Sequence, residues 1–95
     1  MTDPGLLLVA VVEMAAGQVA AGRRYEDDVL ALLHRHGGVL ERRMRDTTDG
    51  TEVHVIRFRD RAGLESFLDD PERRSLRARL GDAAPTTRVL EVHDV

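Results

Sequence analysis

The apolar positions of the chain fall into two similar halves. In the first half, residues 6–12 form a short, continuous apolar run, which is typical of a strand buried on both sides. A loose segment rich in Ala and Gly, residues 15–22, follows this run. Apolar residues then recur at helical spacing from Tyr25 to Leu33, and Gly37 and Gly38 end this helix before a second strand, residues 39–45. The first half therefore has the order strand, helix, strand.

The second half repeats this order after a turn at residues 46–50. Pro71 interrupts its helical region, because proline suits the first turn of a new helix and not the interior of an existing one. The expected elements are a strand at 52–59, a helix from about residue 62, a helical segment from 72 to about 80, and a strand from 87 to about 95. The order βαββαβ predicts one ferredoxin-like α+β domain over residues 1–95, with a four-stranded antiparallel sheet and helices on one of its faces.

All four expected strands carry apolar residues on both faces, although the helices of a two-layer sandwich cover only one face. A second copy of the chain is the simplest cover for the other face. With 95 residues and 42% hydrophobic content the core of one copy is small, so burial between copies would add to stability. The sequence therefore predicts a homodimer in which the two sheets pair.

The register of the hairpin between the second and third strands decides which side chains share a face. A three-residue loop at 48–50 would place Glu41 opposite Arg57 and Arg43 opposite Val55. A two-residue turn at 49–50 would instead place Arg42 opposite Arg57, where like charges repel. We therefore favour the three-residue loop.

This register sorts the side chains of the sheet into two sets. Leu40, Met44, Ile56 and Phe58 would face the helices, and we expect the same of His54. In the fourth strand, alternation separates Leu90 and Val92 from Glu91 and His93. The polar members of the face expected to meet the second copy are Glu41, Arg43, Arg57, Glu91 and His93.

The composition of the chain excludes several classes of partner and of catalytic group. A net charge of −3 with interspersed signs gives no reason to expect nucleic acid or an anionic membrane as partner, and residues 6–12 are too short to span a bilayer. Without cysteine there is no disulfide or thiolate nucleophile, and the expected compartment is the cytoplasm. All 14 basic residues are Arg, so no lysine can form a Schiff base. His34 and His36 point to different sides of a helix, and we expect no metal site and no cofactor.

Three stretches resemble the dimeric α+β-barrel superfamily: the run from Tyr25 through residues 36–43 (HGGVLERR), in which two glycines separate a helix from a strand; the strand ending in residues 56–60 (IRFRD); and the helix break at residues 69–79 (DDPERRSLRAR). The most similar group is an uncharacterised family related to antibiotic-biosynthesis monooxygenases and EthD-like proteins. The resemblance implies that two sheets, one per subunit, enclose a small-molecule pocket. Other members of the superfamily include muconolactone isomerase-like enzymes and haem-degrading proteins.

From the residues and the resemblance together we expect a cofactor-independent enzyme of oxygenase, isomerase or cyclase type, with a role in secondary metabolism. Its substrate would be a small anionic or carbonyl-bearing metabolite. Alternatives are a non-catalytic small-molecule-binding or assembly module, and a haem- or metal-handling protein that would use His93. The candidate catalytic residues are His93, Glu91 and Arg57, and the candidate substrate-binding residues are Glu41, Arg43 and Tyr25.

Overall fold

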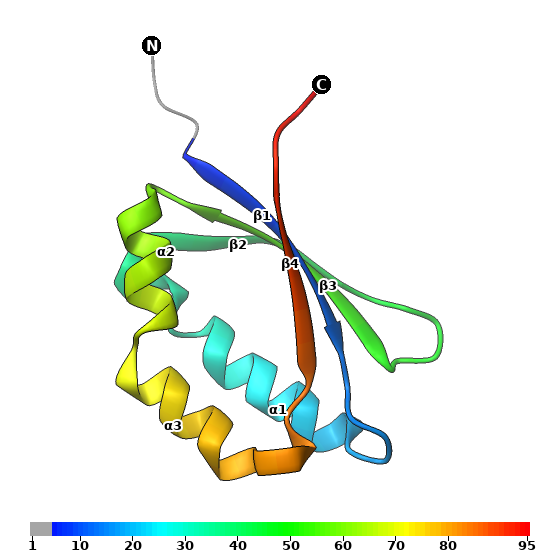
Figure 1. Cartoon of the computed structure of the whole chain (residues 1–95). Coiled ribbons are helices and arrows are strands. Elements are labelled where there is room, and N and C mark those ends of the chain that lie inside the picture. The colour runs from blue at the N-terminus through cyan, green and yellow to red at the C-terminus, as the bar shows by residue number, and fades with distance from the viewer. Residues whose placement is uncertain (1–4) are drawn as a thin grey trace.

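The computed structural model describes residues 5–95 and has the expected ferredoxin-like topology. The sheet order is β2-β3-β1-β4, with every neighbouring pair antiparallel, and Figure 1 shows the helices on one face of this sheet. The elements are β1 (Leu6–Glu13), α1 (Val19–Leu30), the 3-10 helix η1 (Leu33–His36), β2 (Gly38–Arg45), β3 (Thr51–Phe58), α2 (Arg61–Leu68), α3 (Pro71–Leu80), the 3-10 helix η2 (Gly81–Ala83) and β4 (Thr86–Val92).

The core lies between the central strands and the helices. Alternate residues of β1 and β3 are buried beneath the helices, which is the pattern of a sheet with one covered face. The phenyl rings of Phe58 and Phe67 join the sheet to α2 with their centroids 5.7 Å apart. The buried apolar cluster consists of Leu8, Tyr25, Val29, Leu32, Leu33, Ile56, Phe58 and Phe67.

The first helix begins earlier than expected, at Val19, so residues 15–22 are not a loose segment throughout. The amide of Gly22 donates to the carbonyl of Gln18 at 2.9 Å, and an added Cβ at Gly22 would overlap the side chain of Met14. Gly22 thus allows α1 to pack closely against Met14, the residue that follows β1. The expected stop is confirmed, because Gly37 adopts the left-handed conformation with φ of 71° after η1.

Both hairpin registers considered from the sequence are wrong. A β-bulge between Leu40 and Arg42 shifts the pairing, so Arg42 lies opposite Val55 and Arg43 lies opposite His54. Consequently Arg43 faces the helices and Met44 faces outward, the reverse of the expectation. The physical reason is the fully buried carboxylate of Glu52 on β3, which requires cationic partners on the covered face.

The side-chain alternation of β4 is also the reverse of the expectation. Ala10, buried beneath the helices, pairs with Val89, and Leu8 pairs with Glu91. Because directly opposed residues share a face, Glu91 belongs to the helix-covered side, whereas Leu90 lies on the outward side. The strand ends at Val92, which leaves His93 beyond the sheet.

The outward face of the sheet is largely aliphatic. Leu7, Val9 and Val11 of β1 alternate with the buried residues of that strand, and Val39 and Leu90 remain 60% and 41% exposed. In the described residues no helix crosses this face (Figure 1). No helix in residues 5–95 is long and apolar enough to cross a bilayer.

The contact between α2 and η1 depends on Gly63. A Cβ at this position would overlap the backbone carbonyl oxygen of His36, which cannot move without moving η1. We expect Gly63→Ala to lower the free energy of unfolding by about 1–3 kcal/mol in urea denaturation, because of overpacking. Gly50→Ala is the control, since the nearest atom to its Cβ would be Thr48 Oγ1 at an ordinary 3.7 Å. A stabilised Gly63→Ala variant, as helix propensity alone predicts, would contradict this interpretation.

Candidate active site

A cavity of about 400 Å³, partly open to solvent, lies between the covered face of the sheet and the helices. The sheet lines one side of the cavity with apolar residues, and α1, α2 and α3 form the opposite wall. The main apolar lining residues are Leu8, Ala10, Val29, Ile56, Phe58 and Phe67. The polar lining residues are Tyr25, Glu26, His54, Arg73, Arg77 and Thr87. Its size and mainly apolar wall with a few polar groups are typical of a small-molecule site.

Glu26 places a buried carboxyl group on the wall of this cavity. The residue is 5% exposed, and within residues 5–95 its carboxyl group takes part in no hydrogen bond or ion pair. Burial raises the pKa of Glu26 to about 7, and the nearby Glu52 carboxylate adds to the rise. The guanidinium groups of Arg43, Arg73 and Arg77 oppose it. A carboxyl group with a pKa near neutrality can both accept and return a proton.

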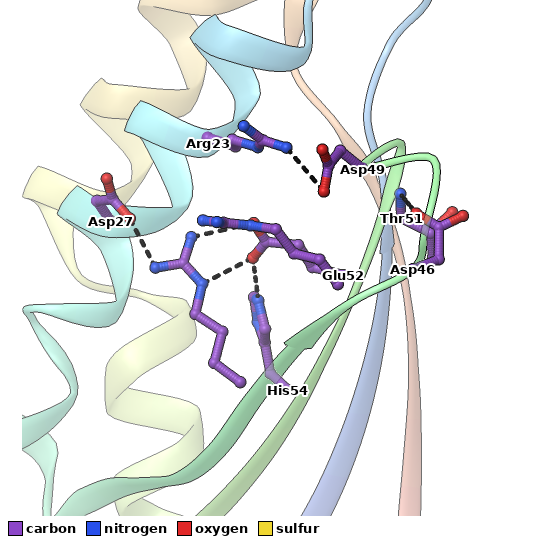
Figure 2. Close-up of polar contacts among 9 residues, drawn as sticks. Arg23, Asp27, Asp46, Asp49, Thr51, Glu52 and His54 are labelled. Carbon is purple, nitrogen blue, oxygen red and sulfur yellow. Dashed lines mark hydrogen bonds and ion pairs between the residues drawn. The ribbon is translucent and has the colours of Figure 1, made fainter.

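A network of charged side chains lies beside Glu26. The carboxylate of Glu52, with 0% exposure, accepts hydrogen bonds from Arg43 Nε at 2.8 Å, Arg45 Nε at 2.8 Å and His54 Nε2 at 2.7 Å. Arg43 also donates to Asp27 Oδ1 at 2.6 Å, which links β2 to α1. Figure 2 shows Glu52 and His54 side by side on β3, with Asp27 across from them on α1. The network therefore joins two strands and a helix at one end of the cavity.

The network sets the protonation states of its members. Burial alone would raise the pKa of Glu52, but the hydrogen bonds from Arg43, His54 and Arg45 outweigh burial and lower that pKa to about 2. Burial lowers the pKa of His54, and its hydrogen bond to Glu52 opposes this only in part. His54 is therefore a neutral imidazole near pH 7.

The tautomer of His54 follows from its partner. An ionised carboxylate only accepts hydrogen bonds, so Nε2 carries the hydrogen and Nδ1 keeps its lone pair. Among the described residues nothing donates to Nδ1 of His54. Since His54 also lines the cavity, it is a second group that can handle a proton there.

Two of the six candidate site residues from the sequence lie at or beside the cavity. Tyr25 lines it, at 6% exposure. Arg43 does not line it but contacts Glu52, the residue that holds His54. The position of Arg43 differs from the outward face, where the sequence placed it.

The other four candidate residues lie outside the cavity lining. Arg57 and Glu41 form a cross-strand ion pair, with Arg57 Nε and Glu41 Oε2 2.9 Å apart. Glu91 accepts two hydrogen bonds from Arg61 of α2, at 2.8 and 2.9 Å, and His93 is exposed beyond β4. The structure thus does not bring Arg57, Glu91 and His93 together, although their catalytic roles stay predictions.

The sequence did not single out Glu26 or Glu52 as functional residues. A usable signal was present, because Glu26 falls within the helical apolar pattern that includes Gly22, Tyr25 and Val29. A charged residue in a buried stripe is unusual unless it is paired or functional. His54 was correctly placed beneath the helices.

A second polar cluster joins η1 to the junction of α2 and α3. His36 contacts Ser66 Oγ through Nδ1 and Asp70 Oδ2 through Nε2, each at 2.7 Å. This is a serine, histidine and aspartate chain, but Ser66 is exposed on α2 and neither Ser66 nor His36 lines the cavity. Asp70 also accepts from the amide of Glu72 at 2.8 Å and so caps α3. We therefore assign this cluster to holding the α2–α3 junction.

Within residues 5–95, no group of three or more His, Asp or Glu residues is placed to hold a metal ion.

Comparison with known proteins identifies the fold. The sequence matches no family model and no curated protein. PA3566 from Pseudomonas aeruginosa has a similar structure, with a TM-score of 0.79 and 17% identity over 100% of this chain and 98% of that one. Rv0793 from Mycobacterium tuberculosis has a TM-score of 0.71 and 20% identity over 96% of this chain and 98% of that one. SnoaB from Streptomyces nogalater, a cofactor-independent oxygenase, has a TM-score of 0.72 and 15% identity over 95% of this chain and 94% of that one. The chain thus has the ferredoxin-like α+β fold that is also found in antibiotic biosynthesis monooxygenases.

Glu52→Gln tests the importance of the buried network. We expect a loss of about 2–4 kcal/mol in the free energy of unfolding at pH 7, because Arg43 and Arg45 lose their buried counter-charge. The folded pKa lies below the ordinary value of 4.5, so this stabilisation is present above pH 4.5 and is lost as the pH falls towards 2. Urea denaturation between pH 3 and 7 should show the two proteins converging in acid.

Glu41→Gln is the matched control, since Glu41 also pairs with an arginine but is 39% exposed in its side chain. Its effect should stay below about 1 kcal/mol at every pH. An equal loss in both variants would contradict the special role of Glu52.

Proposed function

We propose that this protein is a cofactor-independent enzyme that removes a proton from a small, mainly apolar, carbonyl-bearing substrate in the cavity between the sheet and the helices. The observation that carries this proposal is the buried carboxyl group of Glu26, which lines the cavity without a hydrogen-bonding partner among the described residues. Burying a carboxyl group without a hydrogen-bonding partner costs free energy, and strongly perturbed acids in clefts concentrate at functional sites.

The surroundings of Glu26 suit proton abstraction next to a carbonyl group. The ionised carboxylate of Glu26 would take the proton, and the enolate that forms would carry negative charge. Arg73 and Arg77 line the same cavity and supply positive charge. The neutral His54 would exchange a proton at a second substrate atom.

An enolate is a shared intermediate of several cofactor-independent reactions. An isomerase returns the proton to a different atom, and an oxygenase lets the enolate react with O₂. The structural likeness to SnoaB, a cofactor-independent oxygenase, supports the oxygenase branch by analogy of fold alone. On the same basis we propose a role in secondary metabolism, and the cysteine-free composition supports a cytoplasmic setting.

We also propose that two copies of the chain pair through the outward faces of their sheets. The supporting feature is the aliphatic surface formed by Leu7, Val9, Val11, Val55 and Leu90, which no described element covers. Extended apolar surfaces of this kind are typical of association sites. The Arg57–Glu41 ion pair lies at the margin of the same face and would contribute to orientation more than to affinity.

Glu26→Gln tests the catalytic proposal. Small ketones, β-keto acids and phenols would be incubated with the protein in D₂O, and hydrogen–deuterium exchange at carbon would be followed by NMR. We expect the variant to lower the exchange rate by about 100-fold or more. In the wild type the rate should rise with pH through about 7, because only the ionised carboxylate accepts a proton.

Glu65→Gln, an exposed glutamate of α2, is the matched control and should exchange at the wild-type rate. An undiminished rate in Glu26→Gln would refute the role of Glu26. Binding of these compounds without any catalysed exchange would instead favour a non-catalytic binding module.

Val55→Asp tests the dimer. Val55 pairs with Val9 in the middle of the outward face, so a charge there should prevent association. By analytical ultracentrifugation the wild type should have twice the chain mass of 10.6 kDa, and the variant should have the mass of one chain. Val95→Asp, at an exposed position near the end of the chain, should remain dimeric. A monomeric wild type at tens of micromolar would refute the proposal.

A further inference from the structure

The side chain of Arg73 is unusual among the arginines around the cavity. Its Nε atom is buried, and within residues 5–95 its guanidinium group takes part in no hydrogen bond or ion pair. By contrast, Arg43 contacts Glu52 and Asp27, and Arg77 donates to the carbonyl oxygen of Pro85 at 3.3 Å. A buried donor without an acceptor costs free energy, so Arg73 has binding capacity that the fold leaves unused.

The position of Arg73 is well defined without such a bond. Its guanidinium carbon lies 5.2 Å from the centroid of the Phe67 ring, in a cation–π arrangement, and both residues line the cavity. At the backbone, Asp70 caps the first turn of α3 and accepts from the amide of Arg73 at 3.4 Å. The guanidinium group is therefore held at the cavity wall between an aromatic face and the interior.

We propose that Arg73 binds the carboxylate group of the substrate, and that the substrate class is a small monocarboxylic acid with an apolar body. This inference rests on the proposed function, because it concerns the same cavity. A planar guanidinium group matches the two oxygens of a carboxylate with parallel hydrogen bonds. The mainly apolar wall opposite would receive the remainder of the molecule.

The charge of the site favours a carboxylate over a phosphate. Arg73 is the cavity-lining arginine without a hydrogen bond in the described residues, whereas Arg77 is already engaged at Pro85. Arg73 would balance the single charge of a carboxylate, and Arg77, which keeps its positive charge while it donates to Pro85, would remain to stabilise the enolate. The ionisable Glu26 on the same wall would add to the repulsion of a second charge.

Binding of inert probes tests this inference separately from catalysis. Cyclohexanecarboxylate, benzoate, their neutral amides and phenylphosphonate would be titrated into the wild type at pH 7, with affinities measured by calorimetry or ligand-observed NMR. We expect each carboxylate to bind at least about 10-fold more tightly than its amide, and more tightly than phenylphosphonate. Equal affinity for acid and amide, preference for the phosphonate, or no binding of either carboxylate would overturn the inference.

Substitutions then test whether Arg73 causes the preference for carboxylates over amides. Arg73→Gln should reduce the difference between acid and amide to less than about 3-fold while amide binding is unchanged, and Arg73→Lys should give an intermediate preference. Arg74→Gln is the control, because Arg74 is exposed and pairs with Asp69 outside the cavity. A preference that survives in Arg73→Gln, or that disappears only in Arg77→Gln, would overturn the assignment. Should Arg73→Gln fail to fold by circular dichroism, the Lys variant and the wild-type comparison decide.

Two separate measurements distinguish failure of this inference from failure of the proposed function: the preference for carboxylates and the rate of hydrogen–deuterium exchange. Glu26→Gln should retain the preference for carboxylates, since it alters the proton acceptor and not the anchor. Lost exchange with intact carboxylate preference supports both proposals. Lost carboxylate preference with intact exchange on neutral ketones would refute only the substrate class.

Discussion

The buried carboxylate of Glu52 is the constraint on which much of this structure depends. It lies on the covered face of β3, where an unpaired charge would be costly, and it accepts four hydrogen bonds from Arg43, Arg45 and His54. These partners can reach it only because the bulge after Leu40 turns Arg43 and Arg45 towards the helices. The same charge fixes the tautomer of His54 and helps to raise the pKa of Glu26. Strand register, helix attachment and the protonation states at the cavity are therefore coupled.

The cavity follows from how the helices cover the sheet. Helix α3 has no fully buried residue: Leu76 and Leu80 are only partly buried against the core, and Arg73 and Arg77 extend to the cavity. The space between α3 and the sheet is consequently incompletely filled, and Arg73 and Arg77 border it together with Glu26. The similar structures share the fold at 15–20% identity, which leaves the lining residues of this chain to be judged by their own chemistry.

Much of the fold could be predicted from the sequence, and less of the site. The order of elements, the stop at Gly37, the break at Pro71 and the apolar outward face follow from local patterns. The site predictions depended on the pairing of distant residues. The hairpin register was wrong because a bulge leaves no signal in the alternation of a short strand. The face of β4 was wrong because apolar residues occupy both of its sides.

The sequence by itself therefore determined which segments are strands and helices, since the spacing of apolar residues along one segment reflects the geometry of that segment. It also contained the charged residue Glu26 within a buried helical stripe. Only the tertiary structure decided that Glu26, His54 and Arg73 border one cavity, because they come from α1, β3 and α3 and meet through packing between elements. The physical reason is that burial, pKa and unmet hydrogen-bonding capacity depend on neighbours that are distant in the chain.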